Sequence, residues 1–117
     1  MTPKLAAIVI DCADPAKLAE FYRLATGWEI THADGDSAQL SDGGAVGLRL
    51  QRIEGYQGPG WPDDAKQLHL DLTTSDVDES VRELLAAGAT KPDFQPGGAD
   101  WTVLAGPEGH LVCVCAE

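Results

Sequence analysis

A histidine and an aspartate lie two positions apart in an alternating segment of the chain. Within Gln67–Thr73, every second residue is a leucine, and the polar residues between them are His69, Asp71 and Thr73. Because successive side chains of a strand point to opposite faces, this pattern predicts a strand with one leucine face and one polar face. On the polar face, His69 is placed to hydrogen-bond a ligand, with Asp71 fixing its tautomer or charge. The alternative is an intramolecular polar pair that only satisfies the sheet.

The three cysteines are Cys12, Cys113 and Cys115. Their number is odd, and their spacing matches neither a disulfide framework nor a zinc-binding CxxC pair. Cys113 and Cys115 lie two positions apart in an apolar segment, so they share one face of a predicted strand. We interpret the cysteines as buried thiols.

Two tryptophans are candidates for ligand contact. Trp61 lies between Gly60 and Pro62, where a large aromatic side chain needs a partner surface, either a cavity mouth or a dimer contact. Trp101 lies in a late strand, where it can form an aromatic wall. For both residues, plain packing is the alternative interpretation.

Composition excludes several classes of partner. The chain has 117 residues, of which 44% are hydrophobic, and a formal net charge of −11. This charge disfavours nucleic acid and anionic membrane surfaces, which bind clustered lysine and arginine. No apolar run approaches the roughly 20 residues of a membrane span. No N-terminal secretory signal is visible, so we expect a cytoplasmic protein.

The first half of the chain predicts the order β-α-β-β-β. Strands are expected near 4–11, 28–33, 36–41 and 45–53. Asp14 and Pro15 begin a helix as its N-cap and first residue, and Gly27 ends it.

The second half repeats this order. Its expected strands are 67–73, 89–95, 100–105 and 110–116, with a helix from the N-cap Asp76 to Gly88. The chain is therefore predicted to be α+β, one domain over 1–117 built from two tandem modules. Module one is 1–53, the connector is 54–66 and module two is 67–117. Repeats this short cannot each bury a core alone, so the halves must pack or pair.

Three motifs together resemble the vicinal oxygen chelate superfamily of glyoxalases, bleomycin-resistance proteins and extradiol dioxygenases. They are Asp14-Pro15 with Phe21-Tyr22, Gly27-Trp28, and the terminal run Gly106–Leu111. The segment Trp61–Asp71 is similar to a glyoxalase-like antibiotic-resistance branch. The resemblance implies curved mixed sheets with helices outside, a concave face for the ligand, and a cavity that two chains commonly complete, hence a homodimer.

The resemblance also implies where metal ligands would lie, on the first and last strands of each module. Carried onto this chain, these positions are Ala7, Leu48, His69 and Cys113, when Ser41–Leu50 is matched with Gly106–Cys115. Ala7 and Leu48 carry no donor atom, and catalytic zinc needs about three protein ligands. We therefore predict no metal and no other cofactor.

Strand parity places further residues on the expected ligand face. They are Ala7, Val9, Val46, Leu48, Leu50, Leu111 and Cys113. A surface of this composition suits a hydrophobic or aromatic small molecule. The alternative is that these side chains pack against each other and leave no cavity.

The predicted function is a small-molecule-binding protein that sequesters a bulky, largely apolar or aromatic compound, as in antibiotic resistance or self-resistance. One alternative is a metal-dependent lyase, isomerase or dioxygenase, with His69, Cys113 and an unidentified oxygen ligand on the metal. Another is a metal-free enzyme that uses His69 as a general base.

Overall fold

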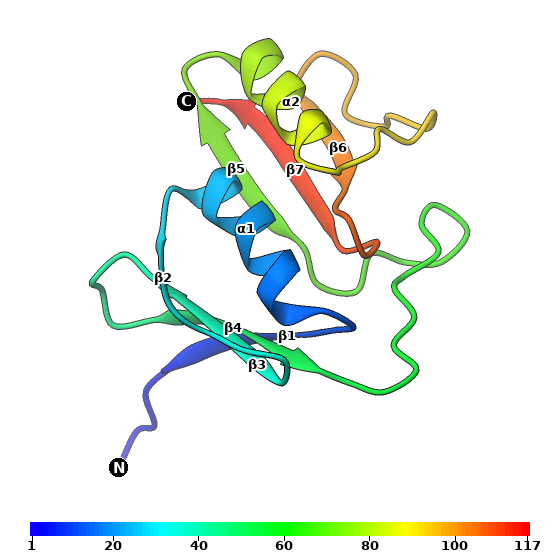
Figure 1. Ribbon diagram of the computed structural model, residues 1–117. Coiled ribbons are helices and arrows are strands. Elements are labelled where there is room, and N and C mark those ends of the chain that lie inside the picture. Colours follow the sequence, from blue (N-terminus) through cyan, green and yellow to red (C-terminus); the bar gives the residue numbers. More distant parts are fainter. The chain divides into compact units, whose positions relative to one another are not determined.

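The computed structural model describes residues 1–117 and divides into two compact units, Met1–Tyr56 and Gln57–Glu117 (Figure 1). Each unit consists of one mixed sheet and one helix, and the sheets have four and three strands. The α+β class with two tandem modules is therefore confirmed. The second unit includes residues 57–66, which are most of the predicted connector 54–66.

The first unit has strand order β1-β4-β3-β2, with β1 parallel to β4 and the other pairs antiparallel. The helix α1 packs against β2, β3 and β4. The elements are β1 (Ala7–Cys12), α1 (Pro15–Thr26), β2 (Glu29–Ala33), β3 (Ser37–Ser41) and β4 (Gly47–Arg52).

Both predicted ends of α1 are confirmed. The Asp14 carboxylate accepts a hydrogen bond of 3.2 Å from the backbone N–H of Lys17, which satisfies one of the free donors of the first turn. Gly27 takes a φ of 73° and donates its N–H to the carbonyl of Arg23. This left-handed conformation is readily available to glycine, so the helix stops there.

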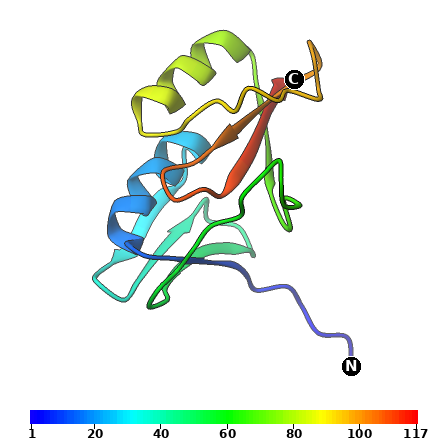
Figure 2. The ribbon, with the colours of Figure 1, turned by 90° about the vertical axis from the view of Figure 1, so that its right-hand side faces the viewer.

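The second unit has strand order β5-β7-β6, with β5 parallel and β6 antiparallel to the central β7. The helix α2 lies beside β7 and contacts β5 and β7 (Figure 2). It begins at the predicted N-cap Asp76, whose carboxylate accepts the N–H of Glu79 at 3.0 Å. The elements are β5 (Leu70–Thr74), α2 (Val77–Ala86), β6 (Trp101–Ala105) and β7 (Leu111–Ala116).

The predicted strand 89–95 is wrong. Only Thr90 forms a bridge there, to Ala105. Pro92 and Pro96 cannot donate a backbone hydrogen bond, so regular pairing along β6 does not continue. The side-chain amide of Gln95 pairs instead with β6, donating to the carbonyl of Val103 and accepting its N–H, both at 2.9 Å.

Two residues expected on the ligand face lie in the core of the first unit. Leu48 and Leu50 are 3% and 0% exposed, whereas Arg49 between them is exposed. In the parallel pairing with β1, the partner of Arg49 is Val9, which is 48% exposed. The open face of this sheet therefore carries Val9 and Arg49, and the two leucines point to the opposite, buried face.

No helix in the structure combines the length and the apolar character needed to cross a membrane.

This assignment of faces predicts unequal effects on stability. Leu50→Ala should lower the free energy of unfolding by about 2–5 kcal/mol, because it leaves a cavity in the core. Val9→Ala should cost less than about 1 kcal/mol, because its side chain is half exposed on a strand. Urea unfolding of both variants measures this difference, and equal losses would contradict the assignment.

Candidate functional site

One face of the second sheet gathers the side chains that can do chemistry. The register sets Asp71 of β5 opposite Cys113 of β7, and Cys113 opposite Val103 of β6. Two residues further along, Cys115 lies opposite Trp101. Because neighbouring residues in register point to the same side, these five side chains share one face.

The alternate residues of the same strands form the opposite face. Val112, Val114 and Leu104 point there and are almost completely buried. The predicted alternation in the segment of His69 and Asp71 is also present, since Leu70 and Leu72 are less exposed than Asp71 and Thr73. The strand begins only at Leu70, so His69 directly precedes β5 and Leu68 is exposed.

Trp61 covers part of the face that carries Asp71 and Cys113. Its side chain packs against the buried cluster of Val103, Leu111 and Cys113. Leu111, which we expected to line a cavity, is therefore only 2% exposed. On its other sides, the Trp61 ring lies 5.6 Å from the ring of Phe94 and 5.3 Å from Lys66 Nζ. Trp61 thus acts here as a packing residue of the second unit.

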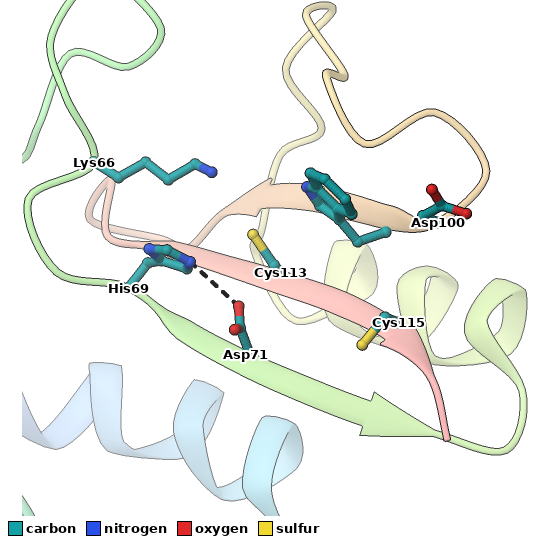
Figure 3. A pocket seen from close by; sticks show the side chains of 7 residues that line it. Lys66, His69, Asp71, Asp100, Cys113 and Cys115 are labelled. Carbon is teal, nitrogen blue, oxygen red and sulfur yellow. Dashed lines mark ion pairs between the residues drawn. The ribbon is translucent and has the colours of Figure 1, made fainter.

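The part of this face that Trp61 leaves uncovered forms a pocket of about 460 Å³ (Figure 3). Of the predicted residues, His69, Asp71, Trp101 and Cys113 line it. Leu111 and Trp61 do not. The full lining is Lys66, His69, Asp71, Asp100, Trp101, Cys113 and Cys115. The expected aliphatic side chains are absent from this lining, so its apolar atoms come from the Trp101 ring, the thiols and side-chain carbons.

Three lining residues were missed in the sequence. Cys115 has the same strand parity as Cys113, and this parity could have placed it on the ligand face. The apolar composition of the segment led instead to its interpretation as a buried thiol. Asp100 immediately precedes Trp101 at the start of β6. Lys66 carries no sequence signal, because it reaches the pocket through the path of residues 57–66.

The predicted pair of His69 and Asp71 is present in the pocket. His69 Nε2 lies 3.2 Å from Asp71 Oδ1, as the dashed line in Figure 3 marks. The His69 side chain is 34% exposed and that of Asp71 is 72% exposed. Asp71 therefore keeps lone pairs that face solvent, and an added ligand can reach both groups without breaking the fold.

Burial raises the pKa of the Cys113 thiol above its ordinary value. The nearby Lys66 ammonium lowers this pKa, whereas Asp71 and Cys115 raise it further. At neutral pH the sulfur is therefore held mainly as the neutral thiol, which is a poor nucleophile. This environment argues against Cys113 as a covalent catalyst in the free protein.

The Trp101 ring lies against the backbone of Gly97. A Cβ atom built at Gly97 would meet three ring atoms of Trp101 at 2.4–2.6 Å, so any larger residue would displace the ring. The loop is fixed on both sides, by the hydrogen bonds of Gln95 to Val103 and by the Asp100 N–H bond to the Gly97 carbonyl at 2.9 Å. Gly97 and Gln95 therefore position the aromatic wall of the pocket.

The predicted match of Ser41–Leu50 with Gly106–Cys115 is off by one residue. With Asp14 set on Asp76, Ala7 corresponds to His69 and Val9 to Asp71. Because Val9 pairs with Arg49 and Asp71 pairs with Cys113, the residue that corresponds to Cys113 is Arg49, in place of Leu48. A shift of one residue moves a strand position to the other face of the sheet. An alanine and a cationic arginine cannot complete a metal site with His69 and Cys113.

Comparison with models of known protein families gave a match over most of the chain. The family model of the glyoxalase-like domain matches residues 7–115. A search of curated protein sequences gave no match.

Three solved structures illustrate the similarity of fold. A possible glyoxalase from Bacillus cereus is 17% identical, with a TM-score of 0.71, and the match covers 97% of this chain and 99% of the other. A glyoxalase/bleomycin resistance protein/dioxygenase family enzyme from Burkholderia phytofirmans PsJN is 18% identical, with a TM-score of 0.70 and coverages of 97% and 98%. The bleomycin-binding protein of Streptomyces verticillus, complexed with copper(II)-bleomycin, is 18% identical, with a TM-score of 0.58 and coverages of 100% and 98%.

The contact between Gly97 and Trp101 predicts that Gly97→Ala displaces the Trp101 ring. The indole N–H resonance of Trp101 should shift in two-dimensional NMR spectra, and the free energy of unfolding should fall by about 1–3 kcal/mol from overpacking. Gly35→Ala is the matched control, because a Cβ at Gly35 meets no atom within 4 Å. An unchanged Trp101 resonance in Gly97→Ala would contradict the positioning role.

Proposed function

The chain belongs to the glyoxalase-like domain family, and on that premise we propose that it is a small-molecule-binding protein that sequesters an aromatic compound. The observation that carries the proposal is the Trp101 ring, which is 39% exposed at the wall of the pocket. Large aromatic side chains are normally covered, and an exposed ring beside a concave surface is a recurrent feature of ligand sites. The pocket volume of about 460 Å³ lies in the range of such sites.

Burial and stacking supply the binding energy in this proposal. A planar ligand lying on the Trp101 ring gains about 0.5–1.5 kcal/mol from stacking, beyond the gain of roughly 25 cal/mol for each Å² of apolar area buried. The contacts of Gly97 and Gln95 already hold the Trp101 ring in place. The ring therefore loses little conformational entropy when a ligand binds.

The charged side chains define the rest of the ligand. Asp71 and Asp100 offer acceptors, and Lys66 and His69 offer donors in the same lining. A purely aliphatic guest would take water away from these groups without supplying new hydrogen bonds, and their desolvation would weaken its binding. The ligand we propose is therefore a planar aromatic compound that also carries hydrogen-bonding groups, with a positive charge favoured by the net charge of −11.

The Streptomyces verticillus structure supports sequestration as the class of function, because that protein is named for binding bleomycin. The likeness extends over the whole of this chain, although at 18% identity it concerns the fold. We propose resistance or self-resistance by sequestration as the biological setting.

A second candidate function is a metal-dependent enzyme of the glyoxalase type. One observation favours it: His69, Asp71 and Cys113 place an imidazole nitrogen, a carboxylate oxygen and a sulfur within 4.8 Å of one another. Turnover of a substrate that stops on addition of a chelator would favour this candidate over sequestration.

We also propose that the chain forms a homodimer. Val9 and Leu5 leave apolar side chains 48% and 67% exposed, and β1, which carries Val9, is an edge strand of its sheet. An edge strand with apolar side chains is a surface that a second chain can cover. Sedimentation velocity at micromolar concentration should therefore give the mass of a dimer, and Val9→Lys should shift it toward a monomer. A monomeric wild-type protein under these conditions would refute the proposal.

Replacing Trp101 by alanine should weaken binding more than folding. With thioflavin T, a planar aromatic cation, as the fluorescent probe, we expect Trp101→Ala to lose about 1–2 kcal/mol of binding, or roughly 5- to 30-fold in Kd. Phe94→Ala is the control, because this ring is 54% exposed but lies outside the pocket lining.

Urea unfolding of the same variants separates binding from stability. If Trp101→Ala binds the probe as tightly as the wild type, or if its loss of stability matches its loss of binding, the sequestration proposal fails.

A further inference from the structure

We propose that the pocket selects a zwitterionic aromatic compound, whose anionic group binds at Lys66 and whose cationic group binds beside Asp100 and the Trp101 ring. Lys66 and Asp100 lie on opposite sides of the pocket (Figure 3). The inference rests on the proposed function and adds to it the sign, the position and the spacing of the two charges on the ligand.

Lys66 and Asp100 are the two charged residues of the lining that have no ion-pair partner in the protein. The third, Asp71, lies 3.2 Å from His69. The only side-chain contact of the Lys66 ammonium is with an aromatic ring, and Asp100 bonds only through its backbone N–H. Each of these two charges is therefore available to a ligand group of opposite sign.

The Lys66 ammonium is held beside Cys113. It lies 5.3 Å from the centroid of the Trp61 ring, a cation–π contact that restrains the long side chain. Trp61 itself packs against Cys113. Burial raises the pKa of the Cys113 thiol, and the ammonium is close enough to offset part of this rise. The ring face takes up no conventional hydrogen bond, so the N–H donors of Lys66 stay available for a carboxylate or phenolate.

Asp100 is fixed next to Trp101 by the turn that also positions the ring. The Asp100 N–H donates to the Gly97 carbonyl at 2.9 Å, and the Trp101 ring lies against the backbone of Gly97. Asp100 and Trp101 are both exposed. A carboxylate beside an open indole ring suits an organic cation, because the carboxylate and the ring face both attract positive charge.

The register of the sheet gives the spacing between these two ends. Trp101 pairs with Cys115, so Asp100 lies at the level of Ala116, three residues along β7 from Cys113. At about 3.3 Å per residue, this spacing is roughly 10 Å. The sulfur atoms of Cys113 and Cys115 line the interval, and polarisable sulfur packs well against aromatic rings. The matching ligand carries its two charges roughly 10 Å apart across an aromatic body.

Asp71 is the charge that opposes this arrangement. It is the strand partner of Cys113, so it repels an anionic group bound at Lys66. His69 offsets part of the repulsion, because its Nε2 lies 3.2 Å from the Asp71 carboxylate. The net charge of −11 also disfavours a ligand that is only anionic, so the cationic group is needed as well.

Dyes that share one xanthene–benzoate frame test the charge pattern on the full chain. Rhodamine with a free carboxylate is a zwitterion at neutral pH, its methyl ester is a cation, and fluorescein is an anion. Fluorescence anisotropy should give a Kd for the zwitterion about three- to fivefold lower than that of the ester, as expected for one partly exposed ion pair. Fluorescein should bind more weakly than either dye.

Substitutions assign the two charges to their residues. Lys66→Met should abolish the preference, so that zwitterion and ester bind within about twofold of each other. Asp100→Asn should weaken both dyes by about three- to fivefold and leave their ratio unchanged, and Asp71→Asn should raise the preference for the zwitterion. Lys91→Met and Glu83→Gln make matching changes of charge at exposed residues outside the lining, so both should keep the wild-type ratio.

The inference is overturned if the wild type binds the ester as tightly as the zwitterion, or if a folded Lys66→Met variant keeps the preference. Circular dichroism checks the fold of each variant, and the comparison of dyes on the wild type needs no variant. If the ester and thioflavin T bind through Trp101 but the zwitterion is not preferred, sequestration stands and only this inference fails. If no dye binds, sequestration fails and the inference falls with it.

Discussion

The register between β5 and β7 is the constraint on which the candidate site depends. Parallel pairing of Asp71 with Cys113 sets a carboxylate beside a thiol, and antiparallel pairing adds Trp101 beside Cys115. A slip of one residue in β7 would turn Val112 and Val114 toward the pocket. The buried opposite face opposes this slip, because it would take Val112 and Val114, which are 0% and 1% exposed, out of the core. The core of the unit therefore fixes the chemistry of its open face.

The second determinant is the path of residues 57–66, which places Trp61 over part of this face and leaves the rest open. Trp61 covers Leu111 and Val103, and burying a leucine side chain stabilises a fold by about 1.5–3 kcal/mol. The covered part therefore contributes stability, whereas the open part keeps exposed polar groups such as Asp71 and His69. The same segment also places Lys66 in the pocket lining, because it ends beside the pocket. A short irregular segment thus both packs the unit and shapes its site.

Local patterns in the sequence predicted much of this arrangement, and long-range pairing accounts for most of the errors. Asp14, Gly27 and Asp76 define helix ends through their own backbone and side chains, so they were predicted correctly. The placement of Leu48 failed because it relied on matching two turns, and an error of one residue reverses a strand face.

The region before β6 shows a different limit. A β-rich run was expected at 89–95, but Pro92 interrupts the backbone donors and the Gln95 side chain replaces them. The same loop contains Gly97, whose need to be glycine becomes visible only when the Trp101 ring lies against it. Sequence reasoning identified Trp101 as a candidate but had no means of finding its support. Contacts of this kind depend on the path of a loop, which local propensity does not specify.

The two units share a plan but offer different chemistry, and this difference decides where function is to be sought. Equivalent backbone positions hold Ala7 and His69, Val9 and Asp71, and Arg49 and Cys113. The second unit thus collects all the donors, whereas the first has an apolar pair beside a cation. A shared fold does not determine function by itself. The reaction or ligand must instead be inferred from the side chains that the strand pairing of each unit places on the open face. At these equivalent positions, nitrogen, oxygen and sulfur ligand atoms occur in the second unit only, so the first unit has no ligand atom to contribute to a symmetric site.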